Sequence, residues 1–160
     1  LLSNVYFGQD SLFQRFYFPN GELSSEGYLL NNIPTGRWTN YHSNGQIKSI
    51  GSWENNKLSG KGEFYDTLGY KILSENYSSG KRNGQQMKYD ASSIVKITTY
   101  SNGVKEGKEY VYFNSLDSVI KLINNYTNNS NKDYIFLYFG PAGGRLYGGV
   151  WGGGAPPGKK

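Results

Sequence analysis

Cysteine is absent from the 160 residues, and histidine occurs only once, as His42. The absence of cysteine excludes disulfides, thiolate chemistry and cysteine-based metal sites. One histidine does not make a cluster of metal ligands. No apolar stretch approaches the length that a membrane-spanning helix needs. We therefore expect neither a bound metal nor a cofactor.

A concentrated charge of one sign is also missing. The formal net charge is +5, but Arg145, Lys159 and Lys160 lie in residues 140–160, which contain no acid. Basic and acidic residues alternate along the rest of the chain. Proteins that bind nucleic acid carry a basic stripe or a recognisable reader motif. Because neither is present, we expect no nucleic-acid partner.

Tyrosine is abundant, with 15 residues, and it is periodic. The interval is 24 residues, at Tyr17, Tyr41, Tyr65 and Tyr89. A fourth, shorter unit runs from Tyr89 to Val111. In each unit a glycine lies five residues before the next tyrosine, at Gly36, Gly60, Gly84 and Gly107. A fixed short period is typical of an array in which each unit buries its apolar surface on its neighbours.

Each unit is predicted to contain two β-strands, because runs rich in Tyr, Trp, Ile, Leu and Thr alternate with the period of a strand. Turns are predicted at Asn20-Gly21, Asn44-Gly45 and Leu68-Gly69, and just before each repeated glycine. Asn-Gly pairs would supply the positive φ that such turns need. Residues 115–125 could form one short helical face, but the tyrosine spacing favours a continued repeat with an insertion.

Two-stranded units in series predict an all-β fold. We expect an elongated, single-layer, twisted antiparallel meander of β-hairpins, with about 24 residues per unit. The array is placed at residues 12–139, with atypical end units at Leu12–Tyr17 and Asp133–Tyr138. Residues 1–11 are either the remnant of a signal peptide, which would mean export to the periplasm, envelope or medium, or a first strand at Val5–Phe7. Residues 140–160 form a Gly-rich tail, interpreted as disordered or foreign to the array.

The recurring pattern resembles the MORN repeat: a tyrosine, two residues, Asn-Gly, a strand, and then a turn of the NNKLSG, SGKRNG or NGVKEG kind before the next aromatic strand. More specifically, it resembles the bacterial variant, found in proteins often labelled as an antitoxin-like group. The resemblance implies a sheet of hairpins and roles in protein scaffolding, dimerisation or lipid contact. Ser92-Ser93, which replaces Asn-Gly, and a longer fifth unit without the glycine depart from the pattern.

Aromatic columns are the candidate binding surface. One column is formed by Tyr17, Tyr41, Tyr65, Tyr89 and Tyr112, which we expect to stack in register. A second contains Leu29, Trp53, Tyr77 and Tyr100. Either the columns are the structural spine of the sheet, or part of one column stays exposed and docks a partner. The candidate partner-binding residues are Trp38, Tyr41, Trp53, Tyr65, Tyr77, Tyr89 and Tyr112.

The predicted function is a non-enzymatic repeat scaffold for protein–protein interaction, with self-association as an open alternative. His42 occupies a position that other units fill with unrelated residues, so it is not interpreted as part of a catalytic triad. The same holds for the carboxylates that could nominally form an acid–base pair, which are Glu54, Glu63, Asp66 and Glu75. A second hypothesis is an exported envelope component that contacts lipid or polysaccharide, with phosphate contacts at turn residues Lys57, Lys61, Lys81 and Arg82. A third is an accessory repeat region of a larger protein whose catalytic part lies elsewhere.

Overall fold

The computed structural model describes residues 10–91, 93–115, 118–139 and 147–152, and side chains within residues 10–91, 93–112 and 123–130. All described elements are strands of one 13-stranded sheet. They are β1 (Leu12–Tyr17), β2 (Leu23–Leu30), β3 (Ile33–Tyr41), β4 (Ile47–Glu54), β5 (Lys57–Tyr65), β6 (Lys71–Ser78), β7 (Lys81–Arg82), β8 (Gly84–Asp90), β9 (Ser93–Ser101), β10 (Val104–Ser115), β11 (Ser118–Thr127), β12 (Ser130–Phe139) and β13 (Tyr147–Gly152).

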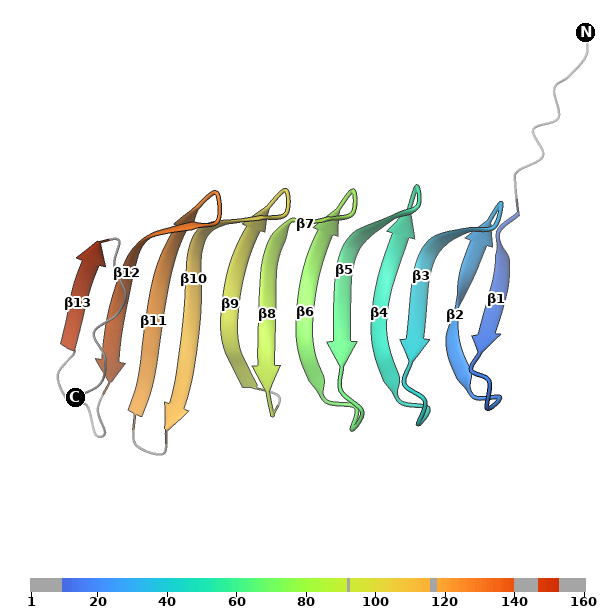
Figure 1. The fold of residues 1–160 in the computed structure, drawn as a ribbon, viewed down its shortest axis with the longest axis horizontal. Coiled ribbons are helices and arrows are strands. Elements are labelled where there is room, and N and C mark those ends of the chain that lie inside the picture. Colours follow the sequence, from blue (N-terminus) through green and yellow to red (C-terminus); the bar gives the residue numbers. More distant parts are fainter. Residues whose placement is uncertain (1–9, 92, 116–117, 140–146, 153–160) are drawn as a thin grey trace, which may run out of the picture.

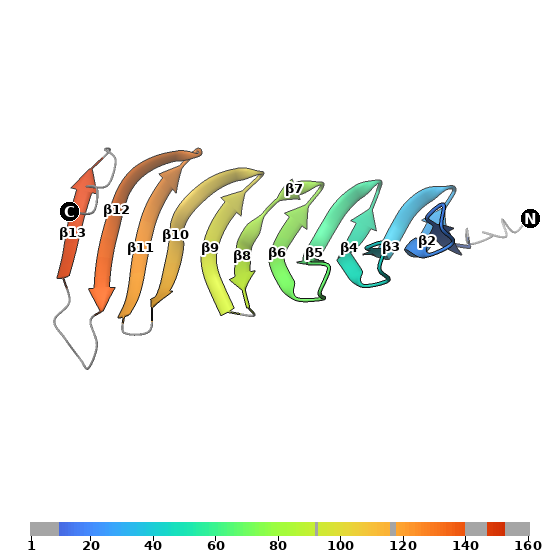
Figure 2. The same ribbon diagram turned by 60° about the horizontal axis from the view of Figure 1, so that its bottom comes forward.

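The sheet is a meander in which each strand pairs antiparallel with the next in sequence, except that the short β7 pairs with β6 and lies off this path. Figure 1 shows the strands side by side in one open layer, from β1 at one end to β13 at the other. Figure 2 shows that the strands are bowed in a common sense. The predicted fold class, a single-layer antiparallel meander of hairpins, is confirmed.

Asparagine closes most of the hairpins at one edge of the sheet. Both residues of each two-residue turn have positive φ, as a type I′ turn requires; for example, φ is 50° at Asn55 and 59° at Asn56. The other turns of this kind are Asn31-Asn32, Ser79-Gly80, Asn102-Gly103 and Asn128-Asn129. Asparagine tolerates the left-handed region better than other non-glycine residues, which explains why so many asparagines occur in the array.

The turns at the opposite edge are confirmed at the predicted positions, and a glycine supplies their positive φ. Only the glycine has positive φ, which is 88° at Gly21 and 83° at Gly45. The side chain of Asn20 instead accepts a hydrogen bond from the backbone N–H of Glu22, at 3.2 Å. The Asn-Gly pairs thus supply positive φ through their glycine, and the asparagine side chain closes the turn by a hydrogen bond to the backbone.

The four repeated glycines lie inside strands, at irregularities of the ladder. Their φ values are positive, from 64° at Gly36 to 102° at Gly84. At Gly60 the pairing with β4 shifts by two residues, since Ile50 pairs with Glu63 but Ser52 pairs with Ser59, as expected of a bulged strand. A branched residue would be strained in this backbone conformation, so the bulge accounts for the fixed glycine.

Hydrogen bonds also connect several turns to the neighbouring unit. At one edge, the N–H of Gly80 donates to the carbonyl of Leu58 at 2.8 Å, and the N–H of Gly103 donates to that of Arg82 at the same distance. At the other edge, His42 Nε2 lies 3.0 Å from the carbonyl oxygen of Tyr65. Successive hairpins are thus joined at their ends as well as along the ladder.

Alternation along each strand divides the side chains between two faces. We call one the Trp38 face. Its central row of neighbours, connected by strand pairing or hydrogen bonds, is Gly27, Trp38, Gly51, Gly62, Glu75, Gln86, Thr98, Glu109 and Asn124. The other is the Glu63 face, whose central row includes Arg15, Glu26, Thr39, Ile50, Glu63, Ser74 and Met87.

Most of the buried side chains of this thin molecule lie in the central row of the Trp38 face; Ser74, on the Glu63 face, and Tyr100, outside the row, are also buried. Among the described side chains, the buried apolar residues are Trp38 and Tyr100. The buried polar residues are Ser74, Glu75, Gln86, Thr98, Glu109 and Asn124. The row therefore changes from glycine and tryptophan in the N-terminal half to hydrogen-bonding side chains in the C-terminal half.

Part of the Gly-rich tail and most of residues 115–125 lie in strands. In the Gly-rich tail, Tyr147–Gly152 forms β13 and pairs with β12. Backbone pairing at a sheet edge needs no buried side chain, which explains how such a sequence becomes a strand. Strands β10 and β11 also replace the helical alternative for residues 115–125. Residues 1–9, 140–146 and 153–160 lie outside the described residues.

Candidate functional site

The candidate aromatic residues do not form one surface, because the strands place them on two faces. Trp38, Trp53 and Tyr77 lie on the Trp38 face, in line with their pairing to Gly51, Gly36 and Gly60. On the Glu63 face lie the tyrosines of the first column, Tyr41, Tyr65, Tyr89 and Tyr112. A single ligand lying on one face of the sheet would contact only one of the two sets.

The tyrosines of the first column are in register but do not stack directly on one another. Successive column members are two strands apart, about 10 Å. Between Tyr65 and Tyr89 lies Lys71, whose Nζ is 5.9 Å from the centroid of each ring. The expectation of direct stacking is thus wrong here, since a lysine from the intervening strand separates the rings.

Glu63 ties this part of the column together. Its Oε1 lies 2.7 Å from Lys71 Nζ and 2.9 Å from Lys61 Nζ, and its Oε2 accepts a hydrogen bond from the hydroxyl of Tyr65. The hydrogen bonds from Lys71 and Lys61 lower the pKa of Glu63 from 4.5 to about 2. Tyr65 thus contributes to an ionic network within the protein.

Tyr41 has a similar role one unit earlier. Its hydroxyl donates to Glu26 Oε1 at 2.7 Å, and Arg15 Nε lies 3.1 Å from Glu26 Oε2. The hydrogen bonds from Tyr41 and Arg15 lower the pKa of Glu26. These contacts connect β1, β2 and β3 across the Glu63 face.

The second column continues along the Trp38 face from Leu29 through Trp53, Tyr77 and Tyr100 to Tyr126. From Trp53 onward, each ring lies opposite a repeated glycine of the preceding strand. In the C-terminal half, the rings make cation–π contacts with basic side chains of the same chain. The Arg82 guanidinium lies 4.1 Å from the centroid of Tyr100, and Lys105 Nζ lies 4.5 Å from that of Tyr126.

Trp38 packs against β1 and β2. Only 8% of its surface is exposed, so little of it is open to a partner. Its indole stacks on Phe16 with a centroid distance of 6.1 Å, and its Nε1 donates to the carbonyl of Tyr28 at 3.1 Å. The ring also covers Gly27, where a Cβ atom would lie 2.5 Å from it. Gly27 and Trp38 therefore fit together as one packing unit.

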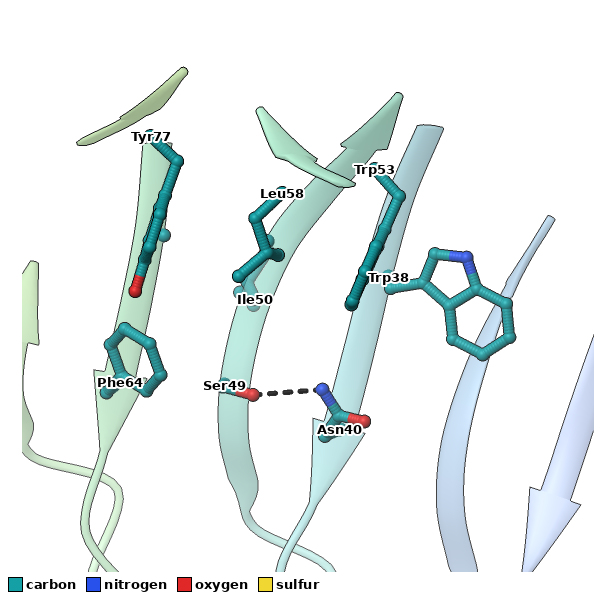
Figure 3. Close-up of a pocket in the computed structure, with 10 residues that line it drawn as sticks. Trp38, Asn40, Ser49, Ile50, Trp53, Leu58, Phe64 and Tyr77 are labelled. Carbon is teal, nitrogen blue, oxygen red and sulfur yellow. Dashed lines mark hydrogen bonds between the residues drawn. The ribbon is translucent and has the colours of Figure 1, made fainter. Parts of the chain in front are cut away.

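Between Trp38 and Tyr77 the Trp38 face has a hollow of about 160 Å³. Its floor is formed by Gly51 and Gly62, neighbours in the central row that have no side chain. Figure 3 shows Trp53 and Tyr77 with their rings nearly edge-on to the viewer and Leu58 between them. We call this feature the glycine hollow.

The glycine hollow was not predicted, although the sequence contains a signal for it. Gly27, Gly51 and Glu75 are spaced by 24 residues, and so are Trp38, Gly62 and Gln86. These two series are the positions of the central row in successive units. The hollow forms in the one place where both series contribute glycine to neighbouring strands.

A second feature missed by sequence reasoning is the carboxylate of Glu109, which is only 2% exposed. It lies 3.0 Å from Lys96 Nζ and 3.2 Å from Lys105 Nζ. It also accepts hydrogen bonds from Thr98 and Asn124, at 2.8 Å and 3.1 Å. Burial alone would raise the pKa of Glu109, but these hydrogen bonds and charges outweigh burial and lower it to about 2.

The described residues include no group of three or more His, Asp or Glu side chains that could hold a metal ion. Nor does this part of the chain have a helix long and apolar enough to cross a membrane. Comparison of the chain with protein-family models and with curated proteins gives no match.

Proposed function

We propose that this chain is a MORN-type repeat scaffold of the bacterial variant kind, and that it binds a protein partner without catalysing a reaction. The proposal is supported by the 24-residue period, the left-handed turns and the bulge glycines, which together make a regular array of hairpins. Such arrays present an extended surface that contacts a partner over several units.

The observation that carries the proposal is the edge strand β1. Its large apolar side chains are exposed: Leu12 by 62%, Phe13 by 43%, Phe16 by 46% and Tyr17 by 59%. Within the described residues, β1 pairs only with β2. A strand with one open side offers unpaired N–H and C=O groups to another chain.

Little protects this edge against pairing. Natural edge strands are blocked by charges, by proline or by a bulge. In β1 the single charged residue is Arg15, whose guanidinium is engaged by Glu26, and the irregularity of its pairing lies at the end of the strand, between Phe16 and Tyr17. We therefore propose that an extended segment of the partner adds to the sheet beside β1, with backbone hydrogen bonds supplying affinity and the apolar side chains supplying selectivity.

The test is partner capture with the whole chain as bait after crosslinking. We expect Leu12→Lys combined with Phe13→Lys to reduce recovery of a specific partner by at least about tenfold, since it adds charge to the docking strand. The matched control is Leu68→Lys, because Leu68 is the most exposed large apolar residue and lies in a turn away from β1. Equal recovery with both variants would place the interface elsewhere, and recovery of no specific protein would contradict the scaffold proposal.

A further inference from the structure

The glycine hollow has aromatic side chains on several sides. Trp53 borders it on β4, and Phe64 and Tyr77 border it on β5 and β6. Trp38 lines it from β3, with its indole turned towards Gly27. Aromatic faces carry the negative part of the ring quadrupole and attract cations. No positively charged side chain lines the hollow among the described residues.

A carboxylate stands next to the hollow in the same row. Glu75 is paired with Gly62 across the ladder and is 6% exposed. It accepts hydrogen bonds from the hydroxyl of Tyr77 and from Gln86 Nε2. Because Tyr77 donates to a carboxylate, its ring is more electron-rich, and together with Glu75 it gives this side of the hollow a negative potential.

Other aromatic rings of this protein are in contact with positively charged side chains. Five contacts place a lysine or arginine over a ring, at distances from 4.1 to 5.9 Å, on Phe13, Tyr65, Tyr89, Tyr100 and Tyr126. None of these contacts involves a ring of the hollow. Arg82 is opposite Tyr77 in the ladder, but its guanidinium lies over Tyr100.

We propose that the glycine hollow binds a quaternary ammonium group, such as the trimethylammonium group of choline. A volume of about 160 Å³ fits a compact group, since a cavity of about 150 Å³ holds benzene. The apolar floor disfavours a bare ammonium ion, which would lose its hydration without gaining hydrogen bonds. A methylated ammonium has no N–H to satisfy, and it keeps the charge that the rings and Glu75 attract.

The charge dependence can be tested with two molecules of the same shape. Titration of the whole chain with choline should change tryptophan fluorescence in a saturable way, with a Kd in the millimolar range. The neutral isostere 3,3-dimethylbutan-1-ol should bind at least about tenfold more weakly, because it lacks the cation. Equal binding of both would make the hollow merely apolar, and no saturation by about 100 mM choline would exclude the site.

Location is tested with Gly51→Ala, which places a methyl group on the floor. That Cβ would lie 3.6 Å from Leu58 Cδ2, an ordinary contact, so the fold should be retained. We expect choline binding to weaken about tenfold or more, with an unchanged melting curve. Ser52→Ala is the matched control, because residue 52 points to the opposite face. Unaltered binding by Gly51→Ala would overturn the proposal.

Glu75→Gln tests the electrostatic part, since it keeps the size of the side chain and removes the charge. It should weaken choline binding and leave binding of the neutral isostere unchanged; equal effects on both would count against the proposal. Co-sedimentation with phosphatidylcholine vesicles, compared with phosphatidylglycerol vesicles, then distinguishes a lipid headgroup from a free cation as the source. Sedimentation with phosphatidylcholine vesicles alone would support a lipid headgroup as the source. Sedimentation with neither kind of vesicle would support a free quaternary ammonium compound.

Discussion

Glu109 shows at the scale of one residue how a single-layer sheet stabilises itself without a dry core. Its carboxylate pairs with two lysines and accepts several hydrogen bonds, from its own strand β10 and from the two neighbouring strands β9 and β11. Lys96 and Lys105 remain partly exposed, at 30% and 28%, so their aliphatic stems shield the carboxylate while their ammonium groups stay hydrated. The buried charge is fully paired, which is the condition under which such a charge is tolerated.

This arrangement predicts acid sensitivity with a definite sign. The pKa of Glu109 is about 2 in the folded chain, below its ordinary 4.5. The carboxylate therefore contributes stability that is fully present above about pH 4.5 and is lost as the pH falls towards 2. That contribution is on the order of 3 kcal/mol.

Urea unfolding of the wild-type chain and of Glu109→Gln checks this prediction. At pH 7 the variant should be less stable by about 3 kcal/mol, and at pH 3 the gap should narrow. Glu22→Gln is the control, since Glu22 lies exposed in a turn. A gap that does not change with pH would show that the charge of Glu109 is not what stabilises the fold.

At the scale of elements, the hairpin turns determine the register. In the turn between β4 and β5, Asn56 has a φ of 59°. We predict that Asn56→Val destabilises the chain by about 1–2 kcal/mol, because a branched residue is strained in the left-handed region. Asn56→Gly should keep or slightly raise stability, and urea unfolding of the pair measures the difference. Equal stabilities would mean that the turn conformation is not under strain.

The strands and turns were predictable because their signals are local. Gly21 and Asn55 mark turns whatever the rest of the chain does, since only a few residue types adopt positive φ cheaply. The assignment of side chains to faces was not predictable in the same way. An irregularity such as that near Gly60, where the pairing shifts by two residues, changes the partners of all later pairs in that strand.

The candidate site depended on such long-range register. Trp38 was predicted as a partner-binding anchor from its residue type, whereas its burial follows from Gly27, 11 positions earlier in the chain and directly opposite in the ladder. Glu109 was not singled out, since a lone glutamate in a sequence is expected at the surface. Its partners Lys96, Thr98 and Asn124 come from other strands, and only the pairing brings them together.

At the scale of the whole molecule, the array predicts that units can be removed as modules. Deletion of residues 41–64 joins Asn40 to Tyr65, which then takes the place of Tyr41 in an otherwise unchanged register. The shortened chain should fold with the same β-type circular dichroism, and its urea m-value should fall by about 15%, in proportion to the surface lost.

The matched control deletes half a unit, residues 41–52. It removes a single strand, so every later strand would run in the wrong direction and meet its neighbour on the wrong face. We expect this variant to aggregate or to remain unfolded. If both deletions behaved alike, the 24-residue period would not be the structural unit.

The hydrogen bonds from several turns to the preceding unit have a consequence for synthesis. Gly80 and Gly103 donate to carbonyl groups that precede them by 22 and 21 positions, at Leu58 and Arg82, and the main contacts of each strand are with its neighbours in the sheet. Nothing in the described array requires an early segment to wait for a distant later one. As the polypeptide leaves the ribosome, each finished hairpin can serve as the template for the next, so the sheet can grow in step with translation from β1 onward.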